Sequence, residues 1–215
     1  MLSIVKSMSL HGLEGYLIDV QVDVSAGMPS WEVVGLPDAS VKESKERVRT
    51  AIKNSVYEFQ SIRIVINLAP ADTKKEGSFF DLPIAIGILF NFEEITKQEL
   101  EDTVFIGELS LDGSLKHMKG VLPMCIEAKN LGIKRVILPE ENAKEASIVE
   151  GIQVIGVKDL KQVVNYLNRK EKIDPKKVNI QEFFYQQKQY PFDFSEVKGQ
   201  ENIKRALEVA AARRA

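Results

Sequence analysis

The sequence predicts an α+β fold in which a β-rich front part is followed by βαβ units. Residues 2–10 and 16–24 are two runs rich in β-branched residues, and glycines between them allow the chain to turn. From residue 121 to residue 167 helical and strand patterns alternate, which is typical of parallel strands joined by helical crossovers. With 215 residues, 44% of them hydrophobic, the chain can bury a core without a disulfide or metal.

The front part contains two predicted helices around one strand. Asp38 is placed to cap a helix over 39–56, whose charged residues at 42–49 are mixed in sign and indicate a solvated face or a subunit contact. A strand follows at 62–67. The next helix runs from about Asp81 to Phe90 and is apolar nearly all round, so we expect it to be buried.

The back part begins with a strand over Thr103–Leu111 and a hairpin turn at 111–114. The alternating elements that follow are helices at 121–131, 141–146 and 158–167 and strands at 135–138 and 152–157. We therefore expect one α/β domain over residues 1–168.

Residues 169–194 are polar and lack apolar periodicity before the cluster Phe183-Phe184-Tyr185, so we interpret them as a linker. Residues 195–215 lead into a helix with an apolar stripe that includes Ile203 and Leu207. Because little chain remains to cover this stripe, we expect 195–215 to begin a further domain that is truncated at Ala215.

Composition excludes several classes of protein. The net charge of −2 argues against a strongly basic nucleic-acid-binding module, although a local basic patch remains compatible with it. One cysteine, Cys125, cannot form an internal disulfide and indicates a cytoplasmic protein. No stretch of about 18 apolar residues is present, so no membrane span is expected.

The sequence also lacks common cofactor motifs. Two histidines and one cysteine cannot supply the four ligands of a structural zinc site, so we expect no metal site. Neither GxxxxGK[ST] nor GxGxxG occurs, so the chain has no nucleotide site of either kind.

Five long motifs point to one family. They are VVGLPDASVKESKERV, INLAPADTKKEGSFFDLPIAIGIL, FIGELSLDGSLKHMKGVLP, LPEENAKEA and FSEVKGQENIKRALEVAAA. In this order they resemble the N-terminal part of the magnesium-chelatase-like AAA+ ATPases, the ComM/YifB family. The resemblance implies a parent protein that uses ATP and Mg²⁺, forms a hexamer and drives DNA branch migration during natural transformation.

The resemblance also implies how the parent protein is divided. Its ATPase core would lie beyond residue 215, so we expect this chain to be non-enzymatic, to hold no cofactor and to have no catalytic residues. Its expected partners are its own C-terminal AAA+ domain, further copies of the same protein and DNA, but no membrane. The expected function is that of an accessory domain that contacts DNA or supports oligomerisation.

Residues 60–168 are also similar to the proteolytic domain of Lon, whose fold is shared with domain 2 of ribosomal small-subunit protein five. That similarity places Phe79 at the position of the Lon nucleophile, with Ser78 one residue earlier. It places Leu122 and Met124 at the lysine positions of the later helix. Because a Ser–Lys mechanism needs a hydroxyl and an amine in contact, the resemblance implies that proteolysis has been lost.

The loop after the strand at 62–67 is the best candidate site. Lys74 and Lys75 offer charge and Gly77 offers close backbone approach to a phosphate or nucleic acid, and Lys116 and Lys119 would extend the patch if the two loops meet. The alternative is an ordinary solvated loop–helix junction, in which Asp72 and Ser78 are structural and Asp81 caps the buried helix.

Three further interpretations stay open. Trp31 could stack a base, although packing or a subunit contact explains it as well. The chain could be a Ser–Lys peptidase-like enzyme on the Lon fold, with Ser78 as its nucleophile. It could also be a purely structural oligomerisation module.

Overall fold

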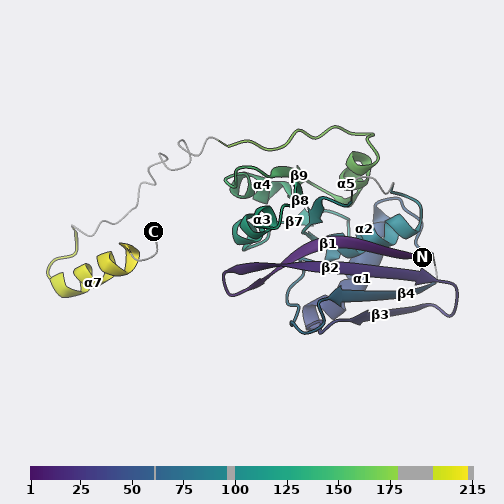
Figure 1. Cartoon of the computed structure of the whole chain (residues 1–215), viewed down its shortest axis with the longest axis horizontal. Helices are drawn as coiled ribbons and strands as arrows, with labels where there is room; N and C mark the ends of the chain where they lie inside the picture. The colour runs from purple at the N-terminus through teal and green to yellow at the C-terminus, as the bar shows by residue number, and fades with distance from the viewer. Residues whose placement is uncertain (61, 96–99, 179–195, 213–215) are drawn as a thin grey trace. The chain divides into compact units, whose positions relative to one another are not determined.

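A mixed sheet of seven strands forms the centre of residues Met1–Val178, in the order β3-β4-β2-β1-β5-β8-β9 (Figure 1). Its strands are β1 (Leu2–His11), β2 (Glu14–Ser25), β3 (Ser30–Val34), β4 (Arg63–Ala69), β5 (Thr103–Phe105), β8 (Arg135–Pro139) and β9 (Gln153–Val157). A second, two-stranded sheet pairs β6 (Glu108–Leu109) with β7 (Leu115–Lys116).

The computed structural model describes residues 1–60, 62–95, 100–178 and 196–212. It divides the chain into two units, Met1–Val178 and Asn179–Ala215. The aromatic cluster at 183–185 lies outside the described residues.

The sheet is mostly parallel. Strand β2 pairs antiparallel with β1 and with β4, whereas the pairs β3·β4, β1·β5, β5·β8 and β8·β9 are parallel. The parallel order of β5, β8 and β9 confirms the expectation drawn from helix–strand alternation. The fold is therefore mixed α/β, with its two antiparallel pairs in the front half.

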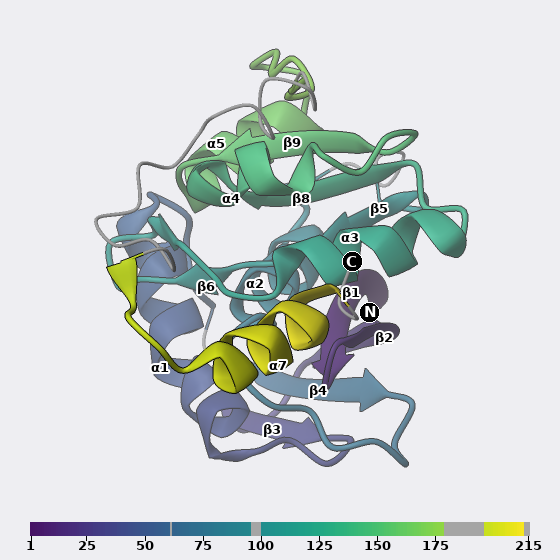
Figure 2. The same ribbon diagram turned by 90° about the vertical axis from the view of Figure 1, so that its left-hand side faces the viewer.

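Helices cover both faces of this sheet (Figure 2). They are α1 (Ala39–Asn54), α2 (Asp81–Asn91), α3 (Val121–Asn130), α4 (Glu140–Ala146) and α5 (Leu160–Leu167). Helices α1, α2 and α5 pack into one hydrophobic cluster with the sheet, and α3 and α4 pack into another. Successive side chains of β8 point to opposite faces of the sheet, as in any strand. Ile137 therefore belongs to the first cluster, whereas Val136 and Leu138 belong to the second.

Helix α2 is the buried helix that the sequence predicts. All residues from Asp81 to Leu89 are buried. Gly87 allows it to approach the sheet, because a Cβ there would lie 2.6 Å from Cγ2 of Val22.

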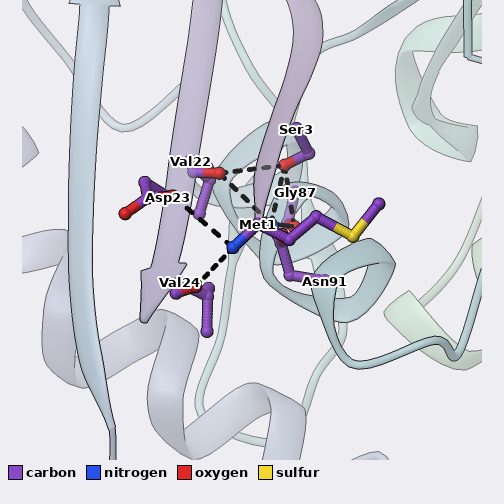
Figure 3. Close-up of polar contacts among 7 residues, drawn as sticks. All are labelled: Met1, Ser3, Val22, Asp23, Val24, Gly87 and Asn91. Carbon is purple, nitrogen blue, oxygen red and sulfur yellow. Dashed lines mark hydrogen bonds and ion pairs between the residues drawn. The ribbon is translucent and has the colours of Figure 1, made fainter. Parts of the chain in front are cut away.

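A polar cluster fastens the end of α2 to β1 and β2 (Figure 3). The side-chain amide of Asn91 donates to the Ser3 hydroxyl at 2.9 Å, to the Gly87 carbonyl at 2.8 Å and to the Val22 carbonyl at 3.2 Å. Ser3 in turn donates to the Gly87 carbonyl at 3.0 Å. These contacts give partners to the Ser3 hydroxyl and to the Asn91 amide nitrogen, which would otherwise be unpaired at the end of a buried helix.

The predicted strand over Thr103–Leu111 is divided in two. After β5 the chain leaves the large sheet, because the N–H of Gly107 donates to Phe79 at 3.0 Å and the Gly107 carbonyl accepts from Leu82 at 2.9 Å. Residues 108–109 then pair with β7. The hairpin turn predicted at 111–114 is confirmed, since the N–H of Ser110 donates to the Ser114 carbonyl across it at 2.9 Å.

The first unit extends to Val178 rather than ending at residue 168. Ile173 packs against the larger hydrophobic cluster, and the N–H of Lys176 donates to the Val154 carbonyl at 2.9 Å. The described beginning of the predicted linker therefore lies along β9.

The second unit contains α7 (Glu201–Ala212). None of the residues of α7 is buried, and the apolar side chains of Ile203, Leu207 and Val209 in this helix are exposed. Over the described residues, we find no helix with the length and apolar character that a bilayer crossing requires.

Candidate functional site

The loop from Pro70 to Phe80 joins β4 to α2 and is held against the turn before α1. The N–H of Asp38 donates to the Lys75 carbonyl at 2.9 Å, and the N–H of Lys75 donates to Leu36 at 3.1 Å. The Asp38 carboxylate accepts from the N–H of Val41 at 2.8 Å, which confirms its predicted capping role, and from the N–H of Gly77 at 3.3 Å. One side chain therefore caps α1 and fixes the loop.

Lys75 turns into the protein. It is fully buried, and its Nζ donates to the carbonyl oxygen of Thr73 at 2.6 Å, to the Thr73 hydroxyl at 3.4 Å and to the Pro70 carbonyl. Burial lowers the pKa of Lys75, whereas the negative charge of the exposed Asp72 acts in the opposite direction. The predicted pair of surface charges is thus corrected to one, because backbone carbonyls take up the Lys75 ammonium group.

The remaining predicted lysines are exposed. Lys74 forms an ion pair with Glu76 at 2.6 Å, and this hydrogen bond raises the pKa of Lys74. Lys116 lies directly opposite Glu108 in the β6–β7 ribbon. Lys119 has no ion pair with any of the described residues.

The start of α2 carries a buried ion pair. Arg47 of α1 donates from Nε to one carboxylate oxygen of Asp81 at 2.7 Å and from a terminal nitrogen to the other at 3.0 Å. Asp81 also accepts from the N–H of Leu109 at 3.2 Å. The predicted capping role of Asp81 is wrong: Asp81 is the first residue of the helix, and its carboxylate turns to Arg47.

Burial is the largest influence on the pKa of Asp81, whereas the hydrogen bond is the largest influence on the pKa of Arg47. Burial raises the pKa of the Asp81 carboxyl group to about 6, although the hydrogen bonds from Arg47 act in the opposite direction. The hydrogen bond to Asp81 raises the pKa of Arg47. The guanidinium is therefore charged, and the carboxyl group titrates near neutrality.

Ser78 and Glu108 extend the polar cluster. The Ser78 hydroxyl donates to the Glu108 carboxylate. The negative charge of Glu108 acts on both Arg47 and Asp81. The structure thereby brings Ser78, Asp81 and Lys116 into one neighbourhood, which we call the α2 cluster: Arg47, Ser78, Asp81, Glu108 and Lys116.

The positions that resemble the Lon dyad are apolar and lie together. Met124 is buried in the second hydrophobic cluster, and Phe79 and Leu122 pack against the same cluster. No lysine amine bonds to Ser78 within the described ranges, where its partner is Glu108. Cys125 is also in this cluster, and burial raises its pKa to about 12, so its thiol is protonated at neutral pH.

Sequence reasoning missed Arg47 and Glu108. Arg47 belongs to the helix face that the sequence indicates as solvated, and its side chain is 23% exposed. Asp81 is the signal from which Arg47 could have been predicted. It is an acidic residue at the start of an otherwise apolar helix, and a buried carboxylate requires a cation as partner.

The fold and the α2 cluster define a mixed α/β domain with an arginine–carboxylate pair, buried on the carboxylate side, at the start of α2. A model of the family described as "Subunit ChlI of Mg-chelatase" matches residues 20–142, which include every residue of this cluster. The chain belongs to the magnesium-chelatase-like AAA+ family, in its ComM/YifB branch.

Similar proteins support this assignment. The competence protein ComM of Haemophilus influenzae is 37% identical over 212 residues, covering 98% of this chain and 42% of that protein. The protein YifB of Escherichia coli is 38% identical over 212 residues, covering 98% and 41%. Lon protease 2 of Bacillus subtilis is 30% identical over 181 residues, covering 75% and 32%. The chain thus spans about two fifths of the first two relatives.

The family match corrects one expectation. We expected a non-enzymatic chain with the whole enzyme core beyond residue 215, because the resemblance placed the ATPase core there and common phosphate-binding motifs are missing. The match to a chelatase subunit instead lies at residues 20–142, inside this chain and across most of its sheet. The absence of GxxxxGK[ST] and GxGxxG was therefore too narrow a basis for excluding enzymatic character.

Proposed function

We propose that this chain is a DNA-contacting domain of a ring-forming, magnesium-chelatase-like AAA+ ATPase, on a fold like that of the Lon proteolytic domain. Its similarity over 98% of its length to a competence protein carries this proposal. By analogy with the ComM/YifB family, the whole protein would act as a hexameric helicase in DNA branch migration.

Three exposed lysines, one in the α2 cluster and two on its adjoining segments, are the proposed contacts. Lys74, Lys116 and Lys119 are all exposed. The loop that contains Lys74 is connected to β6 by the Ser78–Glu108 hydrogen bond, and β6 pairs with β7, which contains Lys116. Phosphates would compete with Glu76 for Lys74, so Lys119, which has no ion pair with a described residue, would contribute more per charge than Lys74.

ATP and Mg²⁺ belong to the proposal for the whole protein. Gly77 and Lys75 do not fit a nucleotide phosphate in the described conformation of the loop, because the Gly77 N–H and the Lys75 ammonium group already have acceptors; the exposed Lys74 is the loop's proposed DNA contact. We therefore derive no catalytic step from these residues. Likewise, the bond from Ser78 to Glu108 and the apolar surroundings of Phe79 do not favour a Ser–Lys peptidase.

The test is DNA binding by the 215-residue chain, measured as fluorescence anisotropy with labelled single-stranded and forked DNA. We expect affinity to fall with added salt, and the triple variant Lys74→Ala, Lys116→Ala, Lys119→Ala to weaken binding. For the single-stranded probe, the salt slope should fall by about 0.7 per lost contact.

Lys129→Ala is the matched control, because this exposed lysine lies at the opposite end of α3 from Lys119. Its affinity should stay close to that of the wild type. Equal affinities of the wild type and the triple variant at low salt would overturn the proposed contact surface and favour a role in oligomerisation.

A further inference from the structure

A small pocket lies at the edge of the large sheet, between β3, α1 and the segment before β4. Its volume is about 90 Å³, and it is lined by Pro29, Ser30, Trp31, Lys45, Arg49, Phe59, Gln60, Ile62 and Ile64. Two of these residues are basic and none is acidic, so the pocket favours negative charge.

Two hydrogen-bond donors of the pocket residues are buried without an acceptor. They are the indole Nε1 of Trp31 and the Nε of Arg49, and neither has a partner in the described part of the chain. Buried donors are rarely left in this state, because their desolvation is then uncompensated. Lys45 and Arg49 also form no ion pair with any described residue.

Aromatic rings hold the guanidinium in place. The central carbon of the Arg49 guanidinium lies 5.6 Å from the ring centre of Phe59. Phe59 itself is fixed between Trp31, at 6.4 Å between ring centres, and Phe92, at 5.9 Å. An arginine that packs through its face keeps the N–H groups at its edge for an acceptor in the same plane.

We propose that this pocket binds an oxyanion, the carboxylate or phosphate group of a ligand. Such a group would accept from the Trp31 indole and from the Arg49 guanidinium, with the Lys45 ammonium supplying further charge. The volume suits a group of this size, because it is several times the roughly 10–15 Å³ that a cavity needs in order to hold one water molecule. The proposal is independent of DNA binding, since none of its residues belongs to the proposed DNA contacts.

The only tryptophan of the chain provides a direct test, because Trp31 gives the single indole N–H resonance of a ¹⁵N-labelled sample. We would titrate the 215-residue chain with sodium phosphate and separately with sodium acetate, keeping the ionic strength constant with sodium chloride. A saturable downfield shift of this resonance is expected with at least one probe, and the tighter probe identifies the phosphate or the carboxylate as the preferred group.

Variants separate a specific pocket from general charge attraction. Arg49→Met should weaken binding of the preferred probe on the order of tenfold or more. Arg49→Lys keeps the charge but removes the Nε donor, so it should also weaken binding. This variant replaces Arg49→Met in the test if the methionine variant does not fold. Lys53→Met is the matched control, because it removes one charge from the exposed end of the same helix.

The proposal is overturned if neither probe shifts the indole resonance in a saturable way. It is also overturned if Lys53→Met weakens binding as much as Arg49→Met, since the attraction would then come from net charge rather than from the pocket.

Discussion

Arg47 and Asp81 form a two-point ion pair between α1 and the buried start of α2, with bonds of 2.7 and 3.0 Å. The carboxylate is fully buried, whereas the arginine side chain is 23% exposed. Because Asp81 also accepts from the N–H of Leu109, it joins α1, α2 and the β6–β7 ribbon. The pair therefore fixes the relative positions of three elements around the candidate site.

Removing the arginine should destabilise the domain strongly. We expect Arg47→Met to lower the free energy of unfolding by about 3 kcal/mol, because it leaves a buried carboxylate without its cation. Urea denaturation of the chain would measure this. Lys53→Met, an exposed change in the same helix, should alter stability by no more than about 0.5 kcal/mol. Similar stabilities of these two variants would show that the pair is not structurally important.

The stability of the domain should depend on the titration of Asp81. Folding raises the pKa of this carboxyl group from 3.8 to about 6, so the folded state binds the proton more tightly than the unfolded chain. The resulting stability is fully present below about pH 4 and is lost as the pH rises through about 6. The difference between the wild type and Asp81→Asn should therefore decline over this window, by at most about 3 kcal/mol.

Two measurements check this prediction. Carboxyl ¹³C NMR should give a titration midpoint for Asp81 near 6, and denaturation series at several pH values should show the declining difference. A midpoint below 4 would mean that the hydrogen bonds from Arg47 outweigh the effect of burial.

Substitution by methionine should destabilise the domain at Lys75 but hardly at the adjacent Lys74. Lys75→Met keeps the length of the side chain but leaves the Thr73 and Pro70 carbonyls without their donor, so we expect a loss of about 1–3 kcal/mol. Lys74→Met removes only an exposed ion pair and should be nearly neutral. Hydrogen exchange should quicken at residues 72–78 in the first variant alone. Equal exchange in both variants would contradict the anchoring role of Lys75.

Gly87→Ala tests the close approach of α2 to the sheet. Alanine usually favours a helix over glycine by about 1 kcal/mol. Here the added Cβ would lie 2.6 Å from the Val22 side chain and 3.2 Å from the Ser3 hydroxyl, so crowding should win and destabilise the domain by about 1–3 kcal/mol. Thermal unfolding followed by circular dichroism measures the change. Combining it with Val22→Ala should recover part of the loss, whereas a stabilised Gly87→Ala variant would show that the packing is loose.

Local sequence patterns predicted most elements of the first unit correctly. The alternation of apolar residues located β1 and β2, Asp38 located the start of α1, and the continuous apolar run at 82–89 identified a buried helix. These features depend on neighbours within a few residues, so the sequence contains them directly. The division of residues 103–111 was missed because contacts of Gly107 with Phe79 and Leu82 cause it.

The candidate site was only half visible in the sequence. Its loop was recognised from Lys74, Lys75 and Gly77. The sequence motifs indicated the family, which the comparisons with known proteins confirm. The direction of each side chain was decided by partners far along the chain. Asp81 turns to Arg47, Ser78 turns to Glu108, and Lys75 turns to carbonyls that only the folded loop presents.

The amino-acid sequence by itself thus determined the order and type of the elements and the family, because periodicity and motifs are local properties. Only the tertiary structure decided which charged groups are buried and which form ion pairs among the described residues. Desolvation and ion pairing depend on distances between residues that are far apart in the sequence, such as Arg47 and Asp81 or Trp31 and Arg49, and folding sets those distances.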